Sequence, residues 1–201
     1  IAEELGAFVF KRRWENDFSK AKNTALEKAG GDWVIFLDAD ERFCEDSIPK
    51  VRPIMEKAHS NRNIEGIKCE IIHLDKDTGQ VTGNDEILRI FRKYKKLRYV
   101  NKIHEELRNN GAPIKCADAR NELSIIHTGY SASVKRDKAI RNLELLKRNA
   151  EDEKAAYYFA STYFILADYE NAYKYADLAL AEAVTACDDR IAYKMHFFKI
   201  F

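Results

Sequence analysis

The sequence predicts an α/β protein, with a mixed, mostly parallel sheet flanked by helices and followed by an all-α hairpin region. Two observations carry the prediction. Strand and helix patterns alternate over residues 7–59, whereas the pattern is purely helical from about residue 133. A chain of 201 residues suits one compact domain with a small helical appendix. We therefore place one domain at residues 1–131 and a helical tail at 132–201.

The first half of the α/β region predicts strand, helix, strand, helix. "AFVF", residues 7–10, is a short buried-strand pattern. Residues 17–31 predict a helix that Asp17 or Ser19 would cap and two glycines would stop. Residues 33–37 are continuously apolar, as in a strand covered on both faces. A helix is expected over residues 47–59, with a proline tolerated in its first turn.

The second half changes rhythm. "IEGIKCEIIHL" and "DEILRIFRK" read as two strands around the polar turn region "DKDTGQVTGN". "ELSIIHTGY", residues 122–130, predicts another strand, and residues 92–121 read as irregular structure with short elements.

The helical tail begins with "SVKRDKAIRNLELLKRNA", which has apolar residues at helical spacing. Residues 155–183 resemble one tetratricopeptide repeat, although Ala156 replaces the signature tryptophan and the closing proline is absent. The matching positions are Phe159, Ala160, Tyr163, Asp168, Tyr169, Ala172, Ala179 and Leu180. A further helix would cap the repeat, which needs a neighbour to bury its faces.

Composition narrows the classes of function. The 34 basic and 33 acidic residues leave a net charge of +1, which argues against a nucleic-acid partner. The basic run "RKYKKLR", residues 92–98, fits equally well beside an anionic donor or acceptor. Single, scattered cysteines exclude paired-cysteine zinc and redox motifs and suggest reduced thiols, so we expect a cytoplasmic location. They are Cys44, Cys69, Cys116 and Cys187.

Acidic residues follow the second predicted strand in "GDWVIFLDADER", residues 31–42. Alternation along an extended chain would point Asp38 and Asp40 the same way, at the carboxyl edge of the sheet. Two close carboxylates repel unless a cation lies between them, and a hard divalent ion prefers oxygen ligands. The pattern suits a clamp for a metal ion and a diphosphate. The alternative is a strand end that carries solvated, helix-capping acids.

A resemblance supports the first interpretation. "WENDFSKAKNTALEKAGGDWVIFLDADE" resembles the family-2 glycosyltransferases of the GT-A fold over 28 ungapped residues. "LRIFRKYKKLRYVNKIHEEL" resembles the second half of the same subgroup. So does "IIHTGYS", followed by a helix of the "K-x-x-R-N-L-x-L-L" type and a tetratricopeptide tail.

The resemblance implies specific roles. Asp38 and Asp40 would be the D-x-D acids of a site for Mn²⁺ or Mg²⁺. Asp40 would touch the metal ion, and Asp38 would contact either the donor ribose or the water shell of the metal. His127 would be a further ligand of the metal or diphosphate, although a lone histidine after an apolar run is more often structural.

Glu105 matches the general base of the inverting members, with Glu106 as the alternative. Asp17, Lys22 and Asn23 match the segment that contacts the donor nucleotide. Lys22 replaces the usual arginine, which removes a planar, bidentate fork.

The function implied is transfer of a sugar from a UDP- or GDP-sugar to a hydroxyl of a glycan, lipid or protein, metal-dependent and inverting. A nucleotidyltransferase with the same clamp would not account for "HEEL" or the tail. The N-terminal family segments "I-S-x-x-M-I-V-K-N-E" and "D-x-G-S-x-D" are not in this sequence, so we expect a truncated domain. The alternative is an interaction protein that uses its helical repeat, on an inactive GT-A remnant, to bind a protein or a membrane surface.

Overall fold

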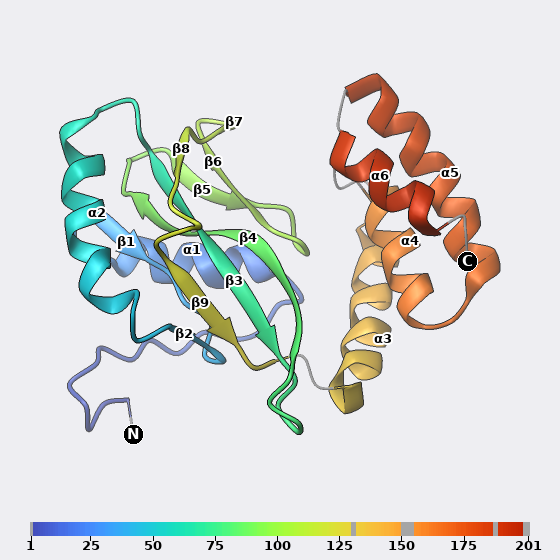
Figure 1. Cartoon of the computed structure of the whole chain (residues 1–201), viewed down its shortest axis with the longest axis horizontal. Helices are drawn as coiled ribbons and strands as arrows, with labels where there is room; N and C mark the ends of the chain where they lie inside the picture. The colour runs from blue at the N-terminus through green and yellow to red at the C-terminus, as the bar shows by residue number, and fades with distance from the viewer. Residues whose placement is uncertain (1, 130–131, 150–154, 187–188, 199–201) are drawn as a thin grey trace.

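The computed structural model describes residues 2–129, 132–149, 155–186 and 189–198. An α/β body is followed by helices that lie beside it (Figure 1). The mixed sheet flanked by helices and the helical tail are as predicted. None of the described helices is long and apolar enough to cross a bilayer.

The main sheet mixes parallel and antiparallel strands. Its order is β1 (Trp33–Ile35), β4 (Val81–Arg92), β3 (Gly66–Leu74), β9 (Ser124–His127) and β2 (Glu41–Phe43), with β8 (Cys116–Asp118) also paired to β3. The pairs β1–β4, β3–β4 and β2–β9 are antiparallel, and β3–β9 and β3–β8 are parallel. The sheet is mixed as predicted, but antiparallel pairs outnumber parallel ones in the described part of the chain, so the expectation that it is mostly parallel is wrong. A short turn returns β4 along β3 as a hairpin, and β1 then lies against β4.

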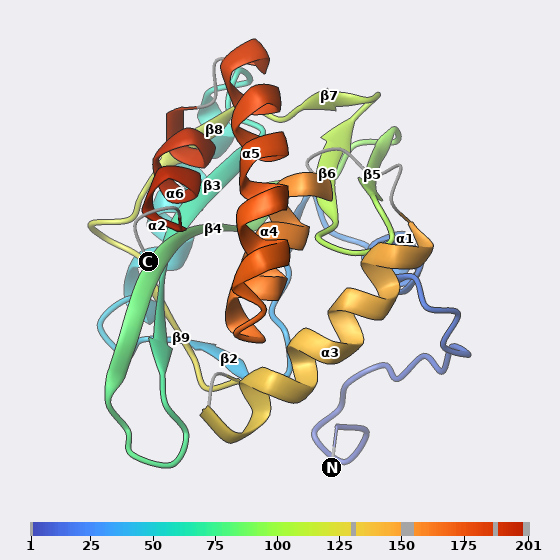
Figure 2. The ribbon, with the colours of Figure 1, turned by 90° about the vertical axis from the view of Figure 1, so that its right-hand side faces the viewer.

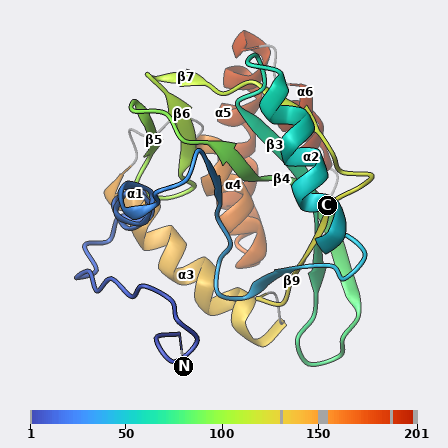
Figure 3. The same ribbon diagram turned by 90° about the vertical axis from the view of Figure 1, so that its left-hand side faces the viewer.

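Helices cover both faces of this sheet, α2 on one and α1 with the helical tail on the other (Figure 3). On one face, α2 (Ile48–Ser60) packs Ala58 against a core that includes Ile67 and Cys69. On the other, α1 (Phe18–Lys28) packs Leu26 against Phe91 and Tyr99. A small second sheet closes this side, formed by β5 (Leu97–Val100), β6 (Glu106–Asn109) and β7 (Ala112–Pro113).

The structure before β1 agrees with the sequence-based prediction only in part. Asp17 caps α1 as predicted, because its Oδ1 accepts a hydrogen bond of 2.9 Å from the Lys20 amide. The strand expected at residues 7–10 is wrong. That segment is irregular, Phe8 is 91 % exposed, and no described strand pairs with it to satisfy its backbone.

The tail consists of α3 (Ala132–Arg148), α4 (Ala155–Ile165), α5 (Tyr169–Ala186) and α6 (Asp189–Phe198). Helices α4 and α5 form the predicted hairpin, and small side chains such as Ala160, Ala176 and Ala179 let it pack closely with α6 through Met195. Aromatic residues fill its other side.

That other side packs on the α/β body (Figure 2). Ile103, from the loop between β5 and β6, lies in one buried cluster with Leu146, Phe159 and Tyr163, and Phe18 of α1 packs against the same cluster. The repeat therefore buries its apolar face against the first domain.

Cys44, Cys69 and Cys116 are free thiols, and burial raises the pKa of Cys69 to about 12; Cys187 lies outside the described residues.

Candidate active site

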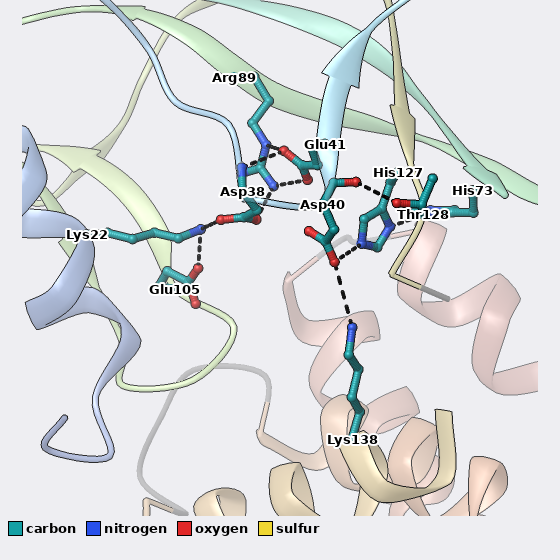
Figure 4. A network of polar contacts seen from close by, with 10 residues as sticks. All are labelled: Lys22, Asp38, Asp40, Glu41, His73, Arg89, Glu105, His127, Thr128 and Lys138. Carbon is teal, nitrogen blue, oxygen red and sulfur yellow. Dashed lines mark hydrogen bonds and ion pairs between the residues drawn. The ribbon is translucent and has the colours of Figure 1, made fainter. Parts of the chain in front are cut away.

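The acidic segment after β1 forms a turn. The Glu41 amide donates to the Asp38 carbonyl at 3.0 Å, and the Asp38 amide donates to the Glu41 carboxylate at 3.1 Å. Alternation along an extended strand no longer applies, so Asp38 and Asp40 face different partners, as Figure 4 shows. The expectation that both point the same way is wrong for this reason.

Asp38 belongs to a network centred on Arg89 of β4. Arg89 donates from Nη2 to Asp38 at 2.7 Å and from Nε to Glu41 at 2.8 Å. The side chains of Arg89 and Glu41 are only 9 % and 2 % exposed, whereas Asp38 is 42 % exposed. Burial alone would lower the pKa of Arg89, but the hydrogen bond to Glu41 and the charges of both carboxylates outweigh it and raise that pKa. Arg89 therefore stays charged and fixes the turn.

Lys22 of α1 extends this network to the loop between β5 and β6. Its Nζ lies 2.6 Å from Glu105 and 3.7 Å from Asp38, and its side chain is 13 % exposed. The same nitrogen lies 5.2 Å from the ring centre of Phe36 and 5.5 Å from that of Tyr99. Burial, with smaller contributions from nearby carboxylates, raises the pKa of the Tyr99 hydroxyl. The predicted residues Lys22, Asp38 and Glu105 thus meet in one place.

Asp40 faces a second, more open group. Its Oδ2 lies 3.3 Å from Nε2 of His127 and 4.0 Å from Nζ of Lys138 in α3. The Asp40 carbonyl accepts from the Thr128 amide at 3.0 Å, which joins the turn to the end of β9. His127 also lies with its Nδ1 3.0 Å from Nδ1 of His73, and burial, then the charge of His127, lowers the pKa of His73.

Asp40 and His127 offer two kinds of ligand that divalent metal ions take. A carboxylate oxygen of Asp40 and an imidazole nitrogen of His127 approach each other at 3.3 Å. Their close packing on the backbone requires glycine at position 129, because a Cβ there would lie 2.0 Å from Asp40 Oδ2 and 2.6 Å from His127 Nε2. No group of three His, Cys, Asp or Glu side chains in the described part of the chain forms a complete metal site. Ions of this kind commonly take one or two protein ligands and the rest from water and phosphate.

Three other predicted residues have structural partners. Asp17 is 6 % exposed and accepts from Ser19 as well as from the helix amide. Asn23 bonds to both the carbonyl and the amide of Tyr99, at 2.9 and 2.8 Å, so it joins α1 to β5. Glu106 pairs with Arg108 at 2.6 Å. Their expected roles in donor binding and catalysis stay predictions.

Sequence reasoning missed Arg89, Glu41, His73 and Lys138. Arg89 lies in an apolar strand, where a single charged residue predicts a buried partner. This signal was available in "EILRIF", but nothing in the sequence pairs that arginine with the acids some 50 residues earlier.

The fold and the site define a class before any comparison: a GT-A-like α/β domain with an acidic turn after β1, a strand at the edge of the described sheet. Residues 1–106 match the model of glycosyl transferase family 2. The chain belongs to that family.

Individual relatives agree with this assignment. The chain is similar to the SPbeta prophage-derived glycosyltransferase SunS of Bacillus subtilis, with 28 % identity over 81 % of this chain and 39 % of that protein. The glycosyltransferase SunS of Bacillus phage SPbeta matches equally. A TPR repeat-containing protein of Synechococcus elongatus is 30 % identical over 52 % of this chain and 24 % of its own length. The chain thus spans 39 % or less of these relatives.

Proposed function

We propose that the chain carries the donor-binding and catalytic part of a metal-dependent, inverting glycosyltransferase. The donor would be a UDP- or GDP-sugar, and the acceptor a hydroxyl of a glycan, lipid or protein. The observation that carries the proposal is the acidic turn, which presents Asp40 beside His127 and Lys138 while Asp38 leads through Lys22 to Glu105.

The residues divide the work. Asp40 and His127 would hold Mn²⁺ or Mg²⁺, and Asp38 would face the donor from its half-exposed position beside Arg89. A bound ion would neutralise charge on the diphosphate as it leaves. Lys138, at the edge of this group, adds a positive charge on the same side.

Glu105 is the better placed general base. Glu105 and Asp38 both pair with Lys22, whereas Glu106 pairs with Arg108. As the acceptor oxygen attacks the anomeric carbon, Glu105 would take the hydroxyl proton. Lys22 would hold the Glu105 carboxylate in place, through their ion pair of 2.6 Å, until the acceptor arrives.

Paired isosteric variants test this assignment. Glu105→Gln is expected to lower kcat for sugar transfer by about 10²–10⁴-fold and to leave UDP and GDP affinity unchanged. Glu106→Gln, the matched control, is expected to change kcat by less than about threefold, because Glu106 is engaged by Arg108 at 2.6 Å and is assigned no part in proton transfer. Equal losses in both variants, or a loss only in Glu106→Gln, would reject Glu105 as the base.

The tail favours a second function, binding of a protein partner. Large apolar side chains are exposed on α5 and α6: Tyr169, Tyr173, Leu178 and Tyr193. Truncating them to serine would abolish such binding, measured by pull-down and sedimentation, without changing nucleotide affinity.

A further inference from the structure

The loop between β5 and β6 carries Glu105 in an unusual backbone conformation. Asn101 and His104 have φ angles of +67° and +52°, a left-handed region that residues other than glycine rarely adopt. Such a conformation is maintained only where surrounding contacts determine it. The contacts that hold residues 101–105 therefore decide where Glu105 lies.

Those contacts come from the helical tail and α1. Ile103 is 3 % exposed and packs among Leu146, Phe159 and Tyr163. Lys102 donates from Nζ to Oδ1 of Asn149 at 2.7 Å. The Lys102 carbonyl accepts from the Phe18 amide at 2.9 Å, where α1 begins. The loop is thus anchored to the tail on one side and to α1, which supplies Lys22, on the other.

His104 adds a ring contact with the tail. Its ring stacks on that of Tyr158 in α4, with centroids 3.6 Å apart and planes 4° apart. Its Nε2 is buried and has no hydrogen-bond partner among the described atoms. Burial lowers the pKa of His104 to about 4, so the ring is neutral at pH 7. A neutral imidazole without a polar partner contributes here as a flat surface.

We propose that the helical tail is part of the active centre, as a platform on which α3 and α4 hold the loop of residues 101–105. Ile103 and His104 are its positioning residues: they touch neither metal nor donor, and they place the Glu105 carboxylate next to Lys22. The proposal rests on the assignment of Glu105 as base. It goes beyond that assignment because it gives the tetratricopeptide-like hairpin a role inside the catalytic unit.

The platform separates two steps of the reaction. Donor binding would depend on the turn at Asp38–Asp40 and on β9, and no residue of either belongs to the buried cluster that holds Ile103. Activation of the acceptor depends on Glu105. Loosening the loop is therefore expected to lower kcat and leave nucleotide affinity unchanged.

The test uses four variants of this chain. His104→Ala and Ile103→Ala remove the contacts, and His104→Phe keeps a flat ring without nitrogen. Met195→Ala is the matched control, because Met195 is fully buried in the cluster of α4, α5 and α6 and does not contact the loop cluster. Amide hydrogen exchange over residues 101–107 reports the loop, UDP titration with Mn²⁺ reports donor binding, and hydrolysis of UDP-glucose and GDP-mannose reports turnover.

We expect loop amides to exchange at least fivefold faster in His104→Ala and Ile103→Ala, with kcat reduced at least tenfold and nucleotide affinity unchanged. His104→Phe and Met195→Ala should behave like the parent in the loop. Unchanged exchange in both alanine variants, or a loss in His104→Phe as large as in His104→Ala, would overturn the platform. If the parent hydrolyses neither donor, the proposed function fails for this chain, and the exchange data still decide whether the tail holds the loop.

Discussion

The two aspartates of the acidic turn lie in opposite environments. Asp38 belongs to a closed network, in which buried Arg89 and Glu41 bond within 3 Å. Asp40 belongs to a looser one, with His127 and Lys138 at 3.3 and 4.0 Å. One acid of the motif shapes the turn, whereas the other, under the proposed function, would exchange its partners for a metal ion.

The largest effect is expected on the free energy of unfolding when Arg89 is removed from the closed network. Arg89→Met leaves Glu41, whose side chain is 2 % exposed, as a buried charge without its partner. Removing one member of a buried ion pair costs about 3–5 kcal/mol. We expect a decrease of that size in the free energy of unfolding, measured in urea. Asp38→Asn, at a half-exposed position, should cost less than about 1 kcal/mol; equal losses would show that the buried pair of Arg89 and Glu41 does not dominate this network.

The next effect is the pH dependence of stability that His104 causes in the loop between β5 and β6. The pKa of His104 is lowered from 6.5 to about 4 by burial, so the unfolded chain binds the extra proton between these values. Stability is therefore lost as the pH falls through this window, by about 2 kcal/mol between pH 7 and pH 5. His104→Phe should remove that part of the pH dependence. Parallel pH profiles for parent and variant would contradict a buried neutral ring.

A smaller effect is expected from Gly129→Ala, which changes the surroundings of Asp40 and His127. In Gly129→Ala the new Cβ meets the ends of two flexible side chains, so Asp40 and His127 must separate while the backbone stays. We expect the Mn²⁺-dependent part of UDP affinity to fall about tenfold, as for changes that reorient metal ligands. Gly83→Ala, where a Cβ meets nothing within 4 Å, is the control. Unchanged affinity in Gly129→Ala would mean that the close approach of Asp40 and His127 is not used for metal binding.

The smallest effect belongs to Lys138→Met. Its Nζ donates to the Gly129 carbonyl at 2.8 Å and lies 4.0 Å from Asp40, and its side chain is 37 % exposed. A screened charge in such a position contributes about 0.5 kcal/mol. UDP affinity should fall two- to threefold, and the loss should vanish at high salt, as isothermal titration at two salt concentrations would show. A loss above tenfold would place Lys138 among the direct ligands.

The sequence was informative where local chemistry decides structure. Helix α1 with its Asp17 cap, the β3–β4 hairpin and the α4–α5 repeat follow from caps, turns and periodicity. The strand expected at residues 7–10 failed because an apolar run needs a neighbouring strand, which the pattern does not report. The orientation of Asp38 and Asp40 failed because the turn depends on Arg89, some 50 residues away.

In the site, too, the residues could be predicted from local sequence, whereas their arrangement depends on tertiary contacts. The sequence placed Lys22, Asp38 and Glu105 on separate segments, and their meeting depends on the packing of α1 against β5 through Asn23 and Tyr99. Likewise, the dependence of the Glu105 loop on Tyr158 lies in tertiary contact alone. Periodicity predicts that α4 has an apolar face and cannot say what covers it.

The central claim is that Asp40 and His127 bind a divalent ion together with the donor diphosphate. Isothermal titration of UDP and of GDP, with and without Mn²⁺, tests it on the parent and on Asp40→Asn. We expect Mn²⁺ to raise the affinity for at least one nucleotide tenfold or more in the parent, and to have no effect in Asp40→Asn. A nucleotide affinity that ignores Mn²⁺ in the parent, or a metal effect that survives in Asp40→Asn, would contradict the account.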